Sequence, residues 1–136
     1  MSAVTLLVMI FSHLLIIGEL EDVMANYGEN ESQRKFWNEA PGQSWVKHDG
    51  VMNLRLGNIS DILFDRLKGT PAFNVLDIGC GTGSTSIRLA KTLTQGALVT
   101  GIDISKPMLE KAREKATELA NVSFVAADAQ TYQFEP

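Results

Sequence analysis

A glycine-rich run, Asp77-Ile78-Gly79-Cys80-Gly81-Thr82-Gly83, is the segment whose residue types most clearly predict binding chemistry. It follows a short apolar segment, residues 73–78, and precedes a segment with helical periodicity, residues 84–93. Glycine lets a backbone turn sharply and approach a ligand, and the amides at the N-terminus of the following helix attract polar and anionic groups. The run therefore predicts a loop that binds a small molecule through its backbone.

Two aspartates lie at the ends of the next two apolar segments. Asp103 follows residues 97–102 and lies 20 positions after Gly83, the distance at which a nucleotide-binding strand-helix-strand unit places a carboxylate for ribose hydroxyls. Asp128 follows residues 122–126. Because open α/β sheets bind ligands outside the carboxyl ends of their strands, these aspartates and the glycine-rich run predict one site for a nucleoside-containing ligand.

The spacing of the glycines separates two kinds of cofactor. The dinucleotide pattern G-x-G-x-x-G would need glycine at position 84 if it began at Gly79, or at position 86 if it began at Gly81. Those positions hold Ser84 and Ser86. An NAD-dependent oxidoreductase is therefore the less favoured alternative.

Three motifs carry a resemblance to class I S-adenosylmethionine-dependent methyltransferases. The glycine-rich run, Gly101-Ile102-Asp103-Ile104-Ser105 and Ala126-Ala127-Asp128-Ala129 look like the successive cofactor motifs of that family. The resemblance covers roughly the last half of the chain. Residues 36–46 are similar to the segment that precedes these motifs in the ubiquinone/menaquinone-type, or type 11, group. The resemblance implies an S-adenosylmethionine cofactor and methyl transfer to a small molecule.

The resemblance assigns the glycine-rich run to the amino-acid part of the cofactor. The backbone of Gly79, Gly81 and Gly83 would hold that part, and Asp77 would line the loop beside it. Cys80 is expected to be a small side chain tolerated next to the cofactor, because a lone cysteine in such a loop needs no other role. The alternative for Cys80 is a thiol with a lowered pKa at a helix N-terminus.

The adenosine part is assigned to the two later motifs. Asp103 would bind both ribose hydroxyls, and Ile104 and Met108 would pack on the adenine. Asp128 would accept a hydrogen bond from the adenine amino group, and the Ala129 amide would reach a ring nitrogen. No residue of the chain is assigned as a catalytic base.

The periodicity predicts an α/β fold in which strands and helices alternate. Residues 73–78, 97–102 and 122–126 are expected as parallel strands, and residues 84–93 and 106–119 as the intervening helices, the second with Ser105 as its N-cap. Ile59, Ile62, Leu63 and Leu67 fall on one face of an earlier helix. With the resemblance, this predicts the N-terminal half of a Rossmann-like, doubly wound parallel sheet, with three strands of an expected seven.

The first 71 residues contain fewer patterns from which structure or function can be predicted. Residues 4–17 are almost entirely apolar, but they are too few for a transmembrane helix, and no positive charge precedes them as in a signal peptide. Three interpretations stay open: a packing helix, a membrane anchor or export signal, and a sequence upstream of the natural start that was translated with the protein. The expected division is an apolar segment, 1–18, then a linker with N-terminal helices, 19–71, and a partial methyltransferase domain, 72–136. Trp37 and Trp45 are expected to pack within those helices, with a lid over the ligand as the alternative.

Composition excludes several classes of protein. Of 136 residues, 45% are hydrophobic, and the net charge of −4 comes with Lys and Arg scattered along the chain, so nucleic acid is not an expected partner. A single cysteine predicts no intrachain disulfide and no metal site, which fits the cytoplasm. The sequence does not set the oligomeric state.

The resemblance also limits what the chain is expected to do alone. Strands four to seven of the family supply most of the acceptor site, and the sequence ends at Pro136, before a fourth strand is expected. We therefore expect an incomplete fragment that binds cofactor but is inactive alone, with one open edge on the first strand. A non-catalytic S-adenosylmethionine-binding module is the other alternative.

Overall fold

The computed structural model describes residues 5–9, 30–67, 74–93 and 97–134, with side chains described from residue 30 onward. Its helices and strands follow in this order: β1 (Thr5–Met9), α2 (Glu31–Asn38), α3 (Ala40–Lys47), α4 (Asp49–Leu67), β2 (Asn74–Ile78), α5 (Ser84–Thr92), β3 (Leu98–Asp103), α6 (Lys106–Lys115) and β4 (Val122–Ala126). Strands and helices alternate from β2 to β4, as the periodicity predicts.

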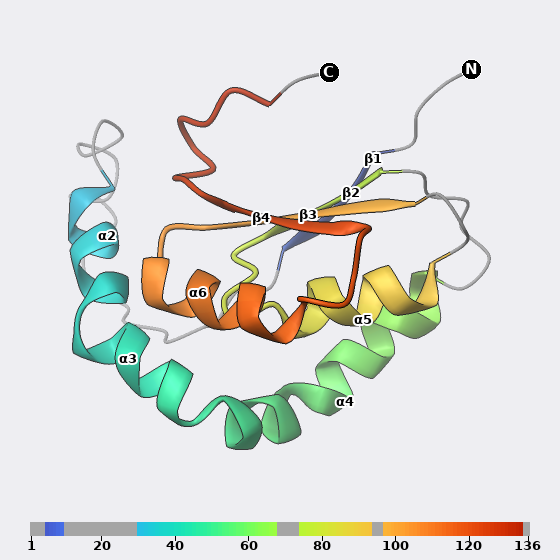
Figure 1. Ribbon diagram of the computed structural model, residues 1–136, viewed down its shortest axis with the longest axis horizontal. Coiled ribbons are helices and arrows are strands. Elements are labelled where there is room, and N and C mark those ends of the chain that lie inside the picture. Colours follow the sequence, from blue (N-terminus) through green and yellow to red (C-terminus); the bar gives the residue numbers. More distant parts are fainter. Residues whose placement is uncertain (1–4, 10–29, 68–73, 94–96, 135–136) are drawn as a thin grey trace, which may run out of the picture.

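One parallel sheet organises the molecule, in the strand order β1-β2-β3-β4. Leu76 of β2 lies opposite Thr100 of β3, which in turn lies opposite Ser123 of β4. Figure 1 shows α4, α5 and α6 along one face of this sheet, with α2 and α3 beside the end of α6. The α/β class and the three predicted strands, β2 to β4, are confirmed.

The core lies between the sheet and the helices α5 and α6. Leu89 of α5 and Leu109 of α6 are 0% exposed, and Val99 of β3 is 1% exposed. Leu98, the neighbour of Val99 on the opposite face of β3, is 55% exposed. This alternation follows from helices that cover only one face of the sheet among the described residues, since successive side chains of a strand point to opposite faces.

Helix α4 is longer than the predicted segment from Ile59 to Leu67, and its shielded residues match the predicted face only in part. Leu63 and Leu67 are half-buried, and Leu67 packs against the core. Ile59 and Ile62 are each 61% exposed, whereas Phe64 is buried. The residues of α4 that are shielded from solvent include a stripe at helical spacing: Asp49, Asn53, Leu56, Ser60, Phe64 and Leu67. Half of this stripe is polar, so a search for apolar periodicity finds Leu67 but misses Asp49, Asn53 and Ser60.

The N-terminal part of the chain also differs from expectation. Residues 5–9 form β1, which pairs in parallel with β2, so the expected open edge on that strand is wrong. Pairing satisfies backbone N–H and C=O groups that an open edge would leave to solvent. Residues 31–38 form α2, and residues 1–4 and 10–29 lie outside the described residues.

No helix among the described residues is long and apolar enough to cross a membrane. The rest of the apolar N-terminal segment lies outside those residues, so its possible role as an anchor stays a prediction, as does the division of the chain at residues 18 and 71.

Candidate cofactor site

The glycine-rich run forms a tight loop between β2 and α5. Gly79, Gly81 and Gly83 all have positive φ angles, 74°, 54° and 76°. A Cβ atom on Gly81 would lie 2.8 Å from the Met108 Cε atom, and one on Gly83 would lie 2.8 Å from the Ala112 Cβ atom. The backbone conformation therefore favours glycine at all three positions, and the close approach of Ala112 on α6 adds a second requirement at Gly83.

Asp103 connects the loop to the end of β3. One carboxylate oxygen accepts a hydrogen bond from the Gly81 amide, 2.8 Å, and the other accepts one from the Ser105 amide, 2.8 Å. Burial raises the pKa of Asp103 above its ordinary value, and hydrogen bonds from the backbone of Ser105, Gly81 and Ile104 oppose this rise. The structure thus brings the first two sequence motifs into direct contact.

Asp77 lies beneath the loop and is fully buried. Its Oδ2 atom accepts a hydrogen bond from the Ser86 hydroxyl at 2.6 Å, whereas Oδ1 is buried without a hydrogen-bond partner. Burial raises the pKa of Asp77 to about 6, against the hydrogen bond from Ser86, and the negative charge of Asp103 raises it further. Among the described residues no basic side chain contributes to the pKa of either aspartate, so this site is electrostatically suited to a cation.

Cys80 is a buried thiol that packs against β3. Burial raises the pKa of this thiol well above its ordinary value, and the nearby charges of Asp77 and Asp103 raise it further. A Cβ atom on Gly101 would lie 2.8 Å from the Cys80 sulfur, which shows how closely the two residues approach. The alternative of an activated thiol with a lowered pKa is therefore wrong, and Cys80 remains a small packing side chain.

The residues assigned to the adenosine part lie at the same edge of the sheet. Met108 is buried in the first turns of α6, with its Cε atom against Gly81. Asp128 follows β4 and is buried, and its carboxylate accepts a hydrogen bond from the Gln130 amide at 3.0 Å. Ala129 follows Asp128 in this turn, and Ile104 lies between Asp103 and α6. Their contacts with adenine stay predictions.

The sequence did not indicate Asn38, which ties the N-terminal helices to this site. Its Nδ2 atom donates to the Ile104 carbonyl at 2.8 Å, and its Oδ1 atom accepts from the Lys106 amide at 2.9 Å. Ser105 has the backbone position of an N-cap, but its hydroxyl donates to the Trp37 carbonyl at 2.6 Å instead of capping α6. Asn38 therefore supplies the hydrogen bond that caps α6, from 68 residues away in sequence.

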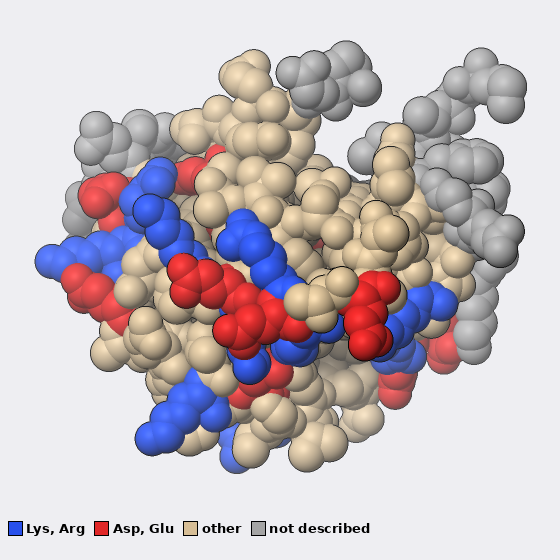
Figure 2. Space-filling model, in the orientation of Figure 1, with Lys and Arg blue, Asp and Glu red and all other residues tan. Residues whose placement is uncertain are grey.

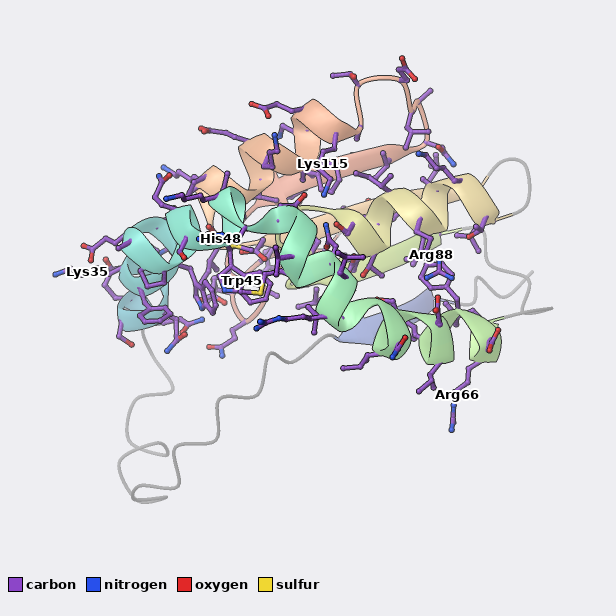
Figure 3. The ribbon with its side chains drawn as sticks, turned by 90° about the horizontal axis from the view of Figure 1, so that it is seen from below. Lys35, Trp45, His48, Arg66, Arg88 and Lys115 are labelled. Atoms are coloured by element: carbon purple, nitrogen blue, oxygen red, sulfur yellow. The ribbon has the colours of Figure 1, made fainter. Side chains whose placement is uncertain are left out.

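The two tryptophans pack against one another. The rings of Trp37 and Trp45 are 6.3 Å apart in an edge-on arrangement, and Phe36 adds a second edge-on contact with Trp37 at 5.1 Å. Figure 3 shows Trp45 projecting from α3 toward the interior of the molecule. This favours the packing interpretation, while the lid over a ligand stays untested.

Comparisons with known proteins identify the class that this fold and site define. Residues 75–136 match the methyltransferase domain family. The chain is 46% identical over 68 residues to demethylmenaquinone methyltransferase of Staphylococcus aureus strain JH9, covering 50% of this chain and 27% of that protein.

Solved structures agree with this match. Magnesium protoporphyrin IX methyltransferase from Synechocystis PCC 6803 with bound S-adenosylhomocysteine is 29% identical, with a TM-score of 0.60, and the match covers 74% of this chain and 52% of that one. The cyclase SpnF is also 29% identical, with a TM-score of 0.50, over 57% of this chain and 29% of that one. Residues 75–136 therefore resemble S-adenosylmethionine-dependent methyltransferases in sequence and in fold. The chain spans about a quarter of the length of the curated relatives it matches.

Proposed function

We propose that this chain binds S-adenosylmethionine at the loop between β2 and α5 and forms the cofactor-binding part of a methyltransferase that acts on a small molecule. The observation that carries the proposal is the arrangement of two carboxylates around a glycine loop, the buried one of Asp77 and the half-buried one of Asp103. Asp103 accepts a hydrogen bond from the Gly81 amide, and Asp77 has a buried carboxylate oxygen without a hydrogen-bond partner. Both features fit a ligand that has a ribose and a positive charge.

The charge of the cofactor explains why two acidic groups lie together. S-adenosylmethionine has a cationic sulfonium and an ammonium group, whereas a dinucleotide has an anionic pyrophosphate. A cation near Asp77 would favour its ionised form and offset the repulsion from Asp103. The carboxylate of Asp103 has further lone pairs for ribose hydroxyls beyond those that accept the two amides.

Methyl transfer needs geometry more than acid–base chemistry. The cofactor supplies the methyl group from its sulfonium, and the protein holds the acceptor and this methyl group in line. In this chain, Gly79, Gly81 and Gly83 would position the amino-acid part and Asp103 the ribose, while Ile104, Met108, Asp128 and Ala129 would position the adenine. The acceptor site and any base belong to parts that these residues do not supply.

A small-molecule acceptor is supported by the names of the relatives, which act on demethylmenaquinone and on a magnesium porphyrin. On the face drawn in Figure 2, acidic and basic side chains are intermixed, which differs from the basic patch of a nucleic-acid-binding surface. The absence of a nucleic-acid partner and the cytoplasmic location stay predictions.

Isothermal titration calorimetry with S-adenosylmethionine and with NAD tests the cofactor. We expect binding of S-adenosylmethionine only, and about a 100-fold loss of affinity in Asp103→Ala, because at least one hydrogen bond to a charged group disappears. Asp103→Asn keeps the size and one acceptor, and serves where the alanine variant unfolds. Asp61→Asn, at an exposed position of α4, is the matched control. Tight NAD binding, or no binding of S-adenosylmethionine, would overturn the proposal.

The reaction needs a separate assay, because the cyclase SpnF shares the fold. Transfer of a labelled methyl group to demethylmenaquinone analogues by a protein that contains this chain would support methyl transfer. Cofactor binding without any transfer would favour the non-catalytic module.

A further inference from the structure

A polar network that the cofactor assignment does not use joins α4, α6 and the glycine loop. Asp49, the first residue of α4, accepts a hydrogen bond from the Thr82 hydroxyl and one from Asn53 Nδ2 at 3.0 Å. Its other oxygen pairs with Lys115 Nζ at 2.9 Å, and Lys115 also donates to the Ser84 hydroxyl at 2.9 Å. Three segments that are distant in sequence, α4, the glycine loop and α6, therefore meet at one carboxylate.

This network is shielded from solvent. The side chains of Asp49 and Lys115 are 17% and 26% exposed, and Thr82 is 7% exposed. Figure 3 shows Lys115 extending from α6 toward the region where α4 and α5 approach. By contrast, an ion pair between Asp61 of α4 and Arg88 of α5 is exposed to 60% and 43%. Shielded charges are screened less by salt and water, so the Asp49 pair has the stronger coupling.

Thr82 connects the network to the glycine loop. Between Gly79 and Gly83 only Cys80 and Thr82 have side chains, and Cys80 packs against β3. The backbone of the loop is held by β3, through the Ile102 carbonyl at 2.8 Å from the Gly79 amide and through Asp103. The Thr82 hydroxyl is the contact through which the N-terminal helices hold the same loop.

Burial alone would raise the pKa of Asp49. The hydrogen bonds from Thr82, Lys115 and Asn53 and the charge of Lys115 outweigh burial, and the pKa is held below its ordinary value. Asp49 is therefore ionised at neutral pH and is a strong acceptor for the Thr82 hydroxyl.

We propose that Asp49 is a positioning residue that holds the glycine loop in its binding conformation through Thr82, with Lys115 as its counter-ion. The inference rests on the proposed function only in naming S-adenosylmethionine as the ligand. It makes helix α4 part of the cofactor site, although α4 contributes no residue to any of the cofactor motifs. Because three glycines give the loop many alternative conformations, a fixed Thr82 lowers the entropy that binding must remove.

The test compares four single variants and one double variant of this chain by calorimetry with S-adenosylmethionine and by hydrogen exchange of residues 79–84 without ligand. Asp49→Ala and Thr82→Val remove the two partners, Thr82→Ser keeps the hydroxyl, and Asp61→Ala removes the exposed ion pair of the same helix. We expect Asp49→Ala and Thr82→Val each to weaken binding about tenfold and to accelerate loop exchange, since a hydrogen bond to a charged group is lost.

The controls separate positioning from general stability. Thr82→Ser should recover most of the affinity that Thr82→Val loses, and Asp61→Ala should leave affinity within about twofold of the original. The double variant Asp49→Ala/Thr82→Val should bind no more weakly than either single variant, because both remove the same interaction. Where Asp49→Ala fails to fold, the Thr82→Val and Thr82→Ser pair decides.

Unchanged affinity and loop exchange in Asp49→Ala and Thr82→Val, or fully additive losses in the double variant, would overturn the inference. Its failure is distinguishable from failure of the proposed function. If the unsubstituted chain binds no S-adenosylmethionine, the proposed function fails, and loop exchange still decides whether Asp49 holds the loop.

Discussion

Helices α5 and α6 and helices α2 to α4 are held to the molecule by different kinds of interaction. Helix α5 buries five residues within nine, and α6 buries three within ten. Helix α4 buries one residue within nineteen, and α2 buries none. The N-terminal helices are held instead by hydrogen bonds from a few polar side chains, such as Asn38 and Asp49. The difference shows that one side of the cofactor site, formed by α5 and α6, is fixed by apolar packing, and that the other side, formed by α2 to α4, is fixed by specific polar contacts.

Removal of a core side chain from α6 should have the largest effect on stability. Leu109 is 0% exposed, so Leu109→Ala should lower the free energy of unfolding by about 3–5 kcal/mol through lost burial and a new cavity. Leu54→Ala on α4, where the side chain is 83% exposed, is the matched control and should change it by less than about 0.5 kcal/mol. Urea denaturation measures both. Equal losses would contradict the division between the two groups of helices.

The second largest effect on stability should come from the buried carboxylate of Asp77. The pKa of Asp77 in the folded chain is about 6, above the ordinary value of 3.8 for an aspartate. Its contribution to stability is therefore full below pH about 4 and is lost as pH rises through about 6, a loss of roughly 3 kcal/mol. In Asp77→Asn this pH dependence should disappear and the chain without ligand should be more stable at pH 7.

Stability of both proteins across pH 4–8, with and without S-adenosylmethionine, measures this effect. Cofactor affinity of the unsubstituted chain should rise from pH 5 to pH 7, as Asp77 ionises. A pH dependence that persists in Asp77→Asn would assign it to another group.

The smallest effect on stability should come from a substitution in the N-terminal helices, which are held by polar contacts. Asn38→Ala removes the hydrogen bonds to the Ile104 carbonyl and the Lys106 amide, which should cost about 1 kcal/mol, as for other helix caps. Because α2 has little apolar burial, this loss should open residues 31–47 locally while the core stays folded. Hydrogen exchange measured segment by segment would show faster exchange there and unchanged exchange in α5. Uniformly faster exchange would mean that the N-terminal helices unfold together with α5 and α6.

The same division explains how much the sequence could predict. The strands β2 to β4, the glycine loop and the position of Asp103 beside it follow from local patterns, because apolar alternation, glycine and a strand-end carboxylate act within a short stretch. The buried face of α4 does not follow, because Asp49 is turned inward by Thr82 and Lys115, which lie 33 and 66 residues away. The contribution of Asn38 could not be predicted either, since its partners are distant in sequence and an isolated asparagine has no characteristic spacing.

The pairing of β1 with β2 has a consequence for the order of folding. Thr5 lies opposite Asn74, whereas Asn74 lies opposite Leu98 and Val99 lies opposite Val122. Closing the first of these pairs brings together residues 69 positions apart, and the other two close loops of 24 and 23 positions. Since longer loops cost more entropy before contacts form, β2, β3 and β4 should assemble first and β1 should join last. The glycine loop can therefore be complete while the neighbouring edge of the sheet is still open.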